Sequence, residues 1–354
     1  MEFSDLKKLC IAAFGADKHA PVAYSCGEEK YTSAEVSKAV AKEFRDLCGY
    51  VEGKGCSYRT FKKNENTIFE LIEETITEIL PPRVEAQYAE FAEVKHIPQG
   101  DRAIFRIKVT DASKRRAKTF VTQAGLAGRY ETFMLDGAEA EIKTNAVAGA
   151  ARIGFEEFLD GRWEFSEFTT LIMEGIDEFI YKAIMDELTA LAAALPAKNK
   201  ATGAGFVEDT FDDLLSAIDV YGKATIYCTQ EFANKMVPSD ARMSGDMKNR
   251  LWDNGWLGNY KGHNVVVLAQ SFTDTTNTTK VVNPQIAYMI PTGNTKPIKI
   301  VFEGQAQTRS VEDNDDWSTD LQTYVKVGVG TIAEIEGNHF IGAYTNTALS
   351  QVRS

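Results

Sequence analysis

The chain has 354 residues, of which 44% are hydrophobic and 25% charged, and its formal net charge is −12. This composition is typical of a globular protein and too apolar for a disordered one. The acidic balance argues against a protein that binds nucleic acid by neutralising phosphates, because such binding needs a basic surface.

The first 62 residues are predicted to form a helical arm. Thr32-Ser33-Ala34-Glu35 has the form of a capping box, and apolar residues follow it at helical spacing. A second box near Asn66 precedes another apolar stripe, which predicts a second helix. We expect Pro81-Pro82 to end that helix, because proline has no N–H for the next turn.

The next segment, residues 95–131, is predicted to form an extended β-hairpin. Apolar and basic residues nearly alternate in Arg102–Val109, so Phe105 and Arg106 should lie on opposite faces. We expect a turn near Asp111–Ser113 and a return strand through Phe120–Thr122. Residues 95–129 contain nine bases and two acids, which makes this segment strongly positive in an acidic chain.

Residues 130–190 reverse the charge, with fourteen acids and four bases. Within them, Glu164–Leu195 predicts one long helix, because apolar residues recur at steps of mostly three and four. Its expected length is ~48 Å at ~1.5 Å per residue. The predicted apolar face consists of Phe165, Phe168, Ile172, Ile176, Phe179, Ala183, Leu188, Leu191 and Leu195.

Residues 205–304 are predicted to form a separate α/β lobe. It should contain a short helix over Thr210–Val220 and strands at Ala224–Cys228, Asn264–Leu268, Ile286–Ile290 and Ile298–Phe302. The remaining chain predicts strands at Gln305–Val311, Leu321–Gly328 and Thr331–Glu336, with an acidic turn at Glu312–Asp316.

Common catalytic and metal-binding signatures are missing from the sequence. It contains no phosphate-binding loop, H-E-x-x-H or G-x-S-x-G motif. His263 is better explained as a turn residue than as a catalytic base, and Asp313–Asp316 lacks the glycine and distal glutamate of a calcium loop. We therefore predict no catalytic, cofactor-binding or metal-binding residues. An enzyme in the 205–304 lobe, with His263 and Asp253 as its polar residues, is the weakest alternative.

The five cysteines and the N-terminal segment argue against a zinc site and a signal peptide. No cysteine pair has C-x-x-C spacing, so we expect free thiols rather than a zinc site. Residues 1–8 do not resemble a signal peptide, and no window reaches the ~18 apolar residues of a membrane span. We expect an intracellular protein with no membrane contact.

The basic run Lys114-Arg115-Arg116-Ala117-Lys118 has three interpretations. A nucleic-acid contact would need interleaved aromatic residues, of which only Phe105 and Phe120 are near. A solvated hairpin tip needs nothing further. We favour a third interpretation, in which the tip docks on an acidic surface of a neighbouring subunit.

The order of parts resembles the major capsid protein of tailed bacteriophages, which has the Hong Kong 97-type fold. Ala151–Asp160 resembles the family's strand and E-x-L-x-D entry to its spine helix. Gly258–Leu268 is similar to the family's x-G-x-P-V strand, with Asn264 where proline is common. Gln305–Glu336 resembles the return of the chain through the peripheral domain. The resemblance covers residues 65–354.

The resemblance implies an α+β, Hong Kong 97-like capsid fold. Its parts would be an N-terminal helical arm (1–62), a peripheral helix and connection (63–94), an extended β-hairpin or E-loop (95–131), a peripheral domain with the spine helix (132–204 and 305–354) and an axial α/β domain (205–304). The protein would assemble in the host cytoplasm as pentamers and hexamers, forming an icosahedral virion shell. That shell would enclose double-stranded DNA without sequence-specific binding, and portal, scaffolding and decoration proteins would be its partners.

In such a shell, the hairpin would lie across an adjacent subunit. Its predicted contacts are Lys114, Arg115, Arg116 and Lys118, and the candidate receivers are Glu156, Glu157, Asp160, Glu164 and Glu167. The same fold also serves encapsulin nanocompartments, which enclose an enzyme rather than DNA. The extra N-terminal helices favour the virus over this alternative.

Overall fold

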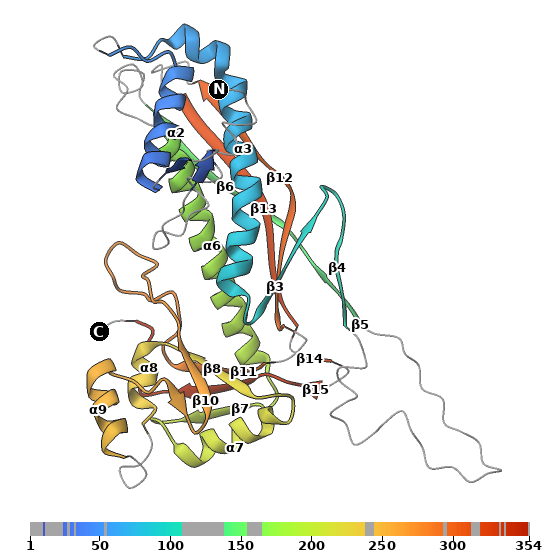
Figure 1. The fold of residues 1–354 in the computed structure, drawn as a ribbon. Coiled ribbons are helices and arrows are strands. Elements are labelled where there is room, and N and C mark those ends of the chain that lie inside the picture. Colours follow the sequence, from blue (N-terminus) through green and yellow to red (C-terminus); the bar gives the residue numbers. More distant parts are fainter. Residues whose placement is uncertain are drawn as a thin grey trace, which may run out of the picture.

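The chain forms an elongated body of two long helices on a four-stranded sheet, with an α/β lobe at one end (Figure 1). The mixed α+β class predicted from the sequence is confirmed. This computed structural model describes residues 10, 24–26, 29–31, 33–52, 55–107, 138–153, 165–237, 244–292, 296–312, 319–332, 334–335 and 338–352.

The first long helix, α3 (Tyr58–Tyr88), continues through Pro81 and Pro82, so the prediction that these residues end it is wrong. The two prolines remove backbone hydrogen bonds at a typical cost of ~3 kcal/mol each. Beyond them, Val84 and Tyr88 stay buried, and burial of such side chains contributes ~1.5–3 kcal/mol each. Packing of the apolar face therefore offsets much of the local preference of the two prolines for ending the helix.

Three elements precede α3. The strands β1 (Tyr24–Cys26) and β2 (Glu29–Tyr31) form an antiparallel pair, and the predicted arm helix α2 (Ser33–Leu47) follows them.

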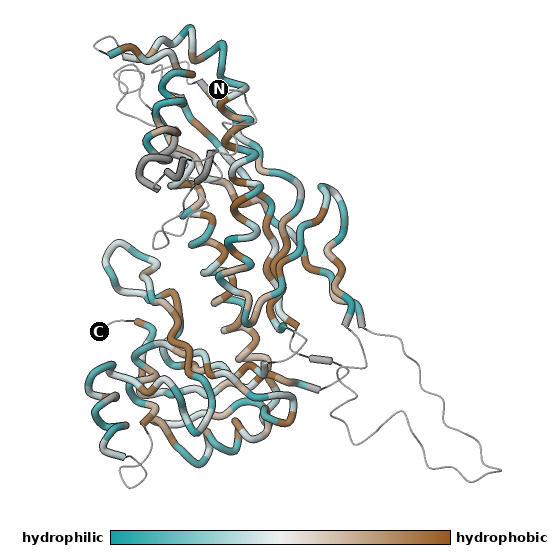
Figure 2. Tube along the Cα trace, viewed as in Figure 1, coloured by the Kyte–Doolittle hydropathy of each residue, from teal (hydrophilic) through white to brown (hydrophobic). Residues whose placement is uncertain are grey.

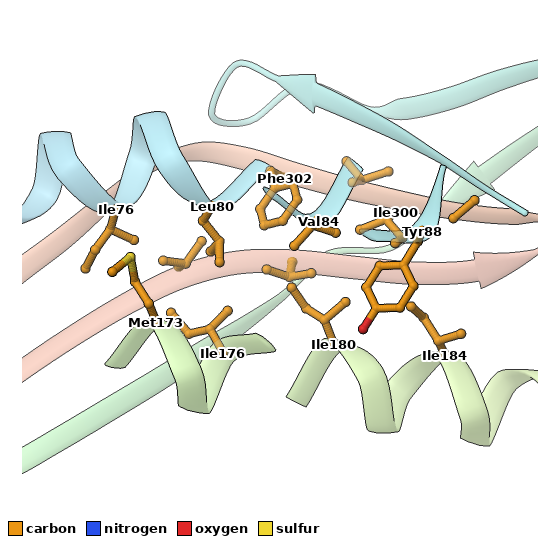
Figure 3. Close-up of a cluster of buried hydrophobic side chains, with 14 of the residues drawn as sticks. Ile76, Leu80, Val84, Tyr88, Met173, Ile176, Ile180, Ile184, Ile300 and Phe302 are labelled. Atoms are coloured by element: carbon orange, nitrogen blue, oxygen red, sulfur yellow. The ribbon is translucent and has the colours of Figure 1, made fainter. Parts of the chain in front are cut away.

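The second long helix, α6 (Phe165–Ala194), confirms the helix predicted over 164–195. Its buried face differs from the prediction, because Phe179 is 44% exposed whereas Ile180 and Ile184 are fully buried. Figure 3 shows Ile176, Ile180 and Ile184 pointing toward α3 and the sheet. Steps of three and four fit more than one stripe on a helix this apolar, and the neighbouring elements decide which stripe is covered.

The four-stranded sheet has the order β3 (Ala92–Ile97), β12 (Ile298–Glu312), β13 (Thr319–Thr331), β6 (Asn145–Ile153). β12 runs parallel to β3 and antiparallel to β13, and β13 runs antiparallel to β6. A bulge interrupts the β12–β13 register between Glu303 and Gln307, next to Gly304 with a φ of +71°. α3 covers this irregularity, because Thr77 and Glu73 accept hydrogen bonds from the N–H groups of Ala306 and Thr308.

The lobe is built on a six-stranded sheet of order β7 (Lys200–Gly203), β16 (Gly342–Asn346), β11 (Ile286–Pro291), β8 (Ala224–Cys228), β10 (His263–Val267), β9 (Asn259–Tyr260). Its helices are α7 (Glu208–Asp219), α8 (Gln230–Lys235) and α9 (Gly245–Asn254), and a small pair, β14 (Glu334–Ile335) with β15 (Asn338–His339), precedes β16. Hydrophobic segments concentrate in the strands inside this lobe (Figure 2).

Two strands correct the predicted limits of the lobe. β16 lies inside the lobe sheet although the sequence placed 305–354 with the spine helix, and β7 pairs with it from before residue 205. Conversely, residues 298–304 belong to β12 in the four-stranded sheet rather than to the lobe. Strand partners are chosen by contacts between distant residues, which a local pattern does not reveal. The wider division into domains stays a prediction.

Aromatic side chains join the lobe to the long helices. Phe91, just after α3, packs edge-on against Tyr227 of β8 with ring centroids 5.1 Å apart. Tyr88 of α3 stacks on Tyr181 of α6, and the Tyr181 hydroxyl donates to the carbonyl of Ala269 in the lobe. The Tyr227 hydroxyl donates to Glu90 at 3.1 Å. Thr189 of α6 and Tyr288 of β11 share a hydrogen bond of 3.1 Å. These contacts tie the lobe to the end of the spine at several points.

The corrected face of α6 makes a prediction about stability. Ile180→Ala should lower the free energy of unfolding by ~2–5 kcal/mol, because it opens a cavity in the core. Phe179→Ala should cost about 1 kcal/mol or less, because its side chain is half exposed. Urea unfolding of dissociated subunits measures both values. A larger loss for Phe179→Ala than for Ile180→Ala would restore the face predicted from the sequence.

Candidate inter-subunit hairpin and its root

A two-stranded stem projects beside the four-stranded sheet. It pairs β4 (Ala103–Ile107) antiparallel with β5 (Ala138–Ile142) (Figure 1). The return strand predicted at Phe120–Thr122 lies outside the described residues. The described partner of β4 begins at Ala138, beyond residue 131, where the hairpin was predicted to end. Lys95 also lies outside the stem, on β3 of the main sheet. We call the hairpin root the two connections that flank residues 103–142, namely the chain just before β4 and the chain just after β5.

The outer face of the stem carries paired charges. Arg106 contacts Glu139 at 3.0 Å, and Arg102 lies 3.9 Å from Glu141. All four side chains are exposed, so each pair contributes at most ~1 kcal/mol. Glu139 and Glu141 come from the segment that the sequence treated as the oppositely charged block. They neutralise the bases of the same hairpin, so the positive charge that remains lies in residues 108–137, with six bases and three acids.

The inner face of the stem packs on the main sheet, as the alternation around Phe105 predicts. Phe105 is buried between two lysines, with Lys95 Nζ 5.5 Å and Lys299 Nζ 5.4 Å from its ring centroid. Such cation–π contacts contribute ~0.5–2 kcal/mol. The Lys95 ammonium also donates to the Ile104 carbonyl at 3.1 Å.

Two glycines of β13 make room for the returning strand. A Cβ built on Gly328 would lie 2.6 Å from the carbonyl oxygen of Lys143, and one on Gly330 would lie 3.1 Å from the Ile142 side chain. Because the close contact at Gly328 is with backbone, no side-chain movement relieves it. The absence of side chains at these positions allows β5 to cross closely over β13 before the chain enters β6.

The carboxylate of Glu303 binds both connections of the stem. Its Oε1 accepts from the backbone N–H of Gly100, before β4, at 3.0 Å and from Lys326 Nζ at 2.9 Å. Its Oε2 accepts from the hydroxyl of Thr144, which follows β5. The Glu303 side chain is only 8% exposed. Buried charges are costly unless they are paired and hydrogen-bonded, and this carboxylate has a donor on each oxygen.

These donors also stabilise the ionised form of Glu303. The Thr144 hydrogen bond, the Gly100 N–H and the Lys326 ammonium together lower the pKa of Glu303 from 4.5 to about 2. The adjacent residue, Gly304, is held as well, because His96 Nε2 donates to its carbonyl at 2.9 Å. The bulged segment of β12 is therefore fixed to both β3 and the stem.

The predicted contact residues themselves fall mainly outside the described part of the chain. Lys114, Arg115, Arg116 and Lys118 lie in the segment 108–137, and Glu156, Glu157, Asp160 and Glu164 lie in 154–164. Glu167 lies on α6, but its side chain is not described. The predicted acidic turn at Glu312–Asp316 is described only at Glu312. The proposed pairing of these groups between subunits thus stays a prediction.

His263, the candidate catalytic base, and the candidate zinc-binding thiols lie in contacts that serve the fold. His263 Nε2 lies 3.2 Å from Asp219, and its Nδ1 lies 3.0 Å from the Ala224 carbonyl, so the ring joins β10 to β8. Cys48 and Cys228 are free and buried, and burial raises the pKa of each thiol to about 12. Within the described ranges, no group of three metal-ligating side chains comes together. None of the helices described here is long and apolar enough to cross a membrane.

The sequence interpretation missed the two most informative residues of the root, Lys299 and Glu303. They are the charged side chains that are buried among the described residues. A signal was present, because Lys299 and Glu303 interrupt the otherwise apolar run Ile298–Phe302 and its continuation into Gly304. A charge inside a strand of this type indicates a specific partner, although the sequence does not name it.

A family model and several solved structures are similar to this chain. The family model described as "SPbeta prophage-derived putative capsid protein YonB" matches residues 19–343. A search of curated proteins found no match. Among solved structures, the chain is similar to the capsid of the cyanophage P-SCSP1u, with 12% identity, 74% of this chain and 88% of that chain covered, and a TM-score of 0.49.

Two further solved structures show similarly low sequence identity and TM-scores. The bacteriophage PhiM1 mature capsid shows 11% identity over 74% of this chain and 87% of that chain, with a TM-score of 0.47. The holo-SrpI encapsulin complex from Synechococcus elongatus PCC 7942 shows 9% identity over 76% of this chain and 89% of that chain, with a TM-score of 0.42. The family assignment rests on the match to residues 19–343.

The lowered pKa of Glu303 predicts a specific dependence of stability on pH. Its folded-state pKa lies below the unfolded value of 4.5, so its contribution is complete above that pH and is lost as the pH falls through about 2. The difference in unfolding free energy between the wild-type chain and Glu303→Gln should therefore be constant from about pH 7 to pH 5 and shrink toward pH 2. Urea unfolding at several pH values measures it. A difference that grows on acidification would contradict this assignment.

Proposed function

The chain belongs to the YonB family of prophage-derived capsid proteins, and we propose that its hairpin holds neighbouring copies together in a closed shell. It is a major capsid protein, and its role is structural. The proposal concerns how that role is performed. We infer a Hong Kong 97-like arrangement with an E-loop, a peripheral domain on the spine helix and an axial lobe, and shells built from pentamers and hexamers.

The stem is the observation that carries this proposal. Its outer charges are satisfied locally by Arg106–Glu139 and Arg102–Glu141, so they do not need a neighbour. The basic run Lys114–Lys118 lies in the 30-residue segment between the two strands. Because the root is anchored and buried, we propose that this segment reaches an adjacent subunit and supplies the positive half of the contact.

The receiving surface is proposed to lie at the start of α6. The candidate acids Glu156, Glu157, Asp160, Glu164 and Glu167 lead directly into this helix. One turn further along, Leu171 is 57% exposed and Phe179 is also half exposed, with Gly175 between them on the same face. A Cβ built on Gly175 would meet no atom within 4 Å. Two apolar side chains flanking an open glycine beside an acidic segment suit a docked arm.

We propose that the shell encloses double-stranded DNA without sequence-specific contacts. The formal net charge of −12 repels DNA phosphates and leaves a packaged genome mobile. Assembly would take place in the host cytoplasm with portal, scaffolding and decoration proteins, and the mature subunit would reside in the virion. An encapsulin-like shell around a protein cargo is the alternative outcome, distinguished by assaying purified particles for packed DNA and protein.

Reversing the four bases tests the role of the hairpin. A chain carrying Lys114→Glu, Arg115→Glu, Arg116→Glu and Lys118→Glu should fold as a subunit but form no shells, because the proposed attraction becomes a repulsion. Circular dichroism and thermal unfolding check the subunit, and sedimentation with negative-stain microscopy checks assembly. Shells of normal size from this variant would show that the basic run is not needed.

A charge swap provides the matched control. Adding Glu156→Lys, Glu157→Lys, Asp160→Lys and Glu164→Lys to the reversed chain should restore shells at least partly, because the opposite charges again face each other. The acid reversals alone should block assembly as the base reversals do. Failure of the swap to restore any assembly, with both subunits folded, would remove these acids from the proposal.

A further inference from the structure

Strand β12 presents different side chains to its two sides. Ile300 and Phe302 point toward α3 and α6, as Figure 3 shows. Lys299 and Glu303 alternate with them and contact the hairpin root instead, through Phe105, Gly100 and Thr144. One central strand therefore packs the helical layer on one side and holds the projecting hairpin on the other.

Buried charge is concentrated at that root. Lys299 is 4% exposed and pairs with Glu93 of β3, and Glu303 pairs with Lys326 of β13. Only one member of each pair is buried, because the Glu93 side chain is 51% exposed and that of Lys326 is 32% exposed, so the pairs add little stability. What they add is geometry, because Lys299 and Glu303 are buried and tolerate few arrangements that leave them without a partner. Their position at the base of the projecting element suggests that the orientation of that element is what they determine.

We propose that Glu303 is a positioning residue, whose carboxylate holds the two connections of the hairpin at fixed points on β12 and so sets the direction in which the hairpin leaves the subunit. Gly100 precedes β4 by three residues, and Thr144 follows β5 by two. One side chain thus binds the connections of both stem strands at the root. The part of this inference that concerns a neighbouring subunit rests on the proposed function.

The surroundings of Glu303 suit such a role. The bulge and the positive φ of Gly304 turn β12 locally, and a Cβ on Gly304 would lie 3.2 Å from the Gln99 side chain. Lys326 stands directly opposite Glu303 across the β12–β13 pair. The close crossing of Lys143 over Gly328 brings Thr144 within reach of the carboxylate. The course of the backbone and the position of Lys326 therefore both bring donors to the Glu303 carboxylate.

Hydrogen–deuterium exchange on the full chain tests the clamp. Glu303→Gln keeps the shape but loses the charge, and should raise amide exchange in β4 and β5 by at least about tenfold relative to wild type. Exchange in the buried parts of α3 and α6 should stay unchanged. Glu139→Gln, which alters an exposed glutamate on the same stem, serves as the control and should change exchange in the stem less than about twofold.

A second variant acts on one connection only. Thr144→Val is similar in volume and removes one donor, so it should raise exchange in the stem by less than Glu303→Gln does. If Glu303→Gln leaves the stem protected, or loosens every element equally, Glu303 is not a positioning residue. If neither variant folds, Lys326→Gln, which removes only one partner of the carboxylate, provides the same comparison and must loosen the stem selectively.

Shell assembly then separates this inference from the proposed function. Glu303→Gln subunits should form fewer or irregular particles under conditions in which wild-type subunits form uniform shells. Uniform shells from a variant whose stem exchanges rapidly would overturn the positioning role. If wild-type subunits form no shells, the proposed function fails, while the exchange data still decide whether Glu303 clamps the stem.

Discussion

The structure depends on β12 being covered on both faces. On one face, Ile300 and Phe302 complete a core with the facing stripes of α3 and α6. On the other face, Lys299 and Glu303 receive the root of the hairpin. A strand with two buried faces must satisfy two sets of contacts in one register, and a shift by one residue would exchange them. This constraint places the helices, the sheet and the projecting stem relative to one another.

The elongated shape follows from the two long helices. The 30 residues of α6 span ~45 Å, and α3 lies beside it over much of that length (Figure 1). The lobe attaches at one end through the Phe91–Tyr227 ring contact and the hydrogen bond from the Tyr181 hydroxyl to the Ala269 carbonyl, rather than folding back over the sheet. A subunit of this form has long edges, which suit the proposed packing of copies side by side in a shell.

Charge is used differently at the root and on the outer face of the hairpin. The exposed pairs of the stem lie in water and contribute little, whereas the desolvated groups at Glu303 restrict the arrangement of the chain. The sequence divides into a basic segment and an acidic segment, and part of the acidic segment folds back to neutralise the basic one through Glu139 and Glu141. Arg102 and Arg106 are therefore paired within the stem, and the bases that remain for the proposed contact belong to residues 108–137 of the sequence.

Local pattern predicted the elements whose signals are contained within one stretch of chain. The spine helix, the α2 helix, the strand around Phe105 and the lobe strands at Ala224–Cys228 and Ile286–Ile290 were all readable from periodicity. The order of these parts also resembles that of the capsid family. Periodicity suffices here because each of these elements buries a face of its own.

Only the tertiary structure decided features that depend on distant partners. α3 continues through Pro81 and Pro82 because Val84 and Tyr88 are covered by other elements, and Ile180 rather than Phe179 is buried because of where the sheet lies. β16 belongs to the lobe sheet because it pairs with β11, and β12 belongs to the four-stranded sheet because it pairs with β3, far away in the chain. Glu303 acquires its role only when Gly100 and Thr144, more than 150 residues away, meet at its carboxylate. A local stretch of sequence contains only one of the two partners in each of these contacts, whereas the free energy of the contact depends on both partners.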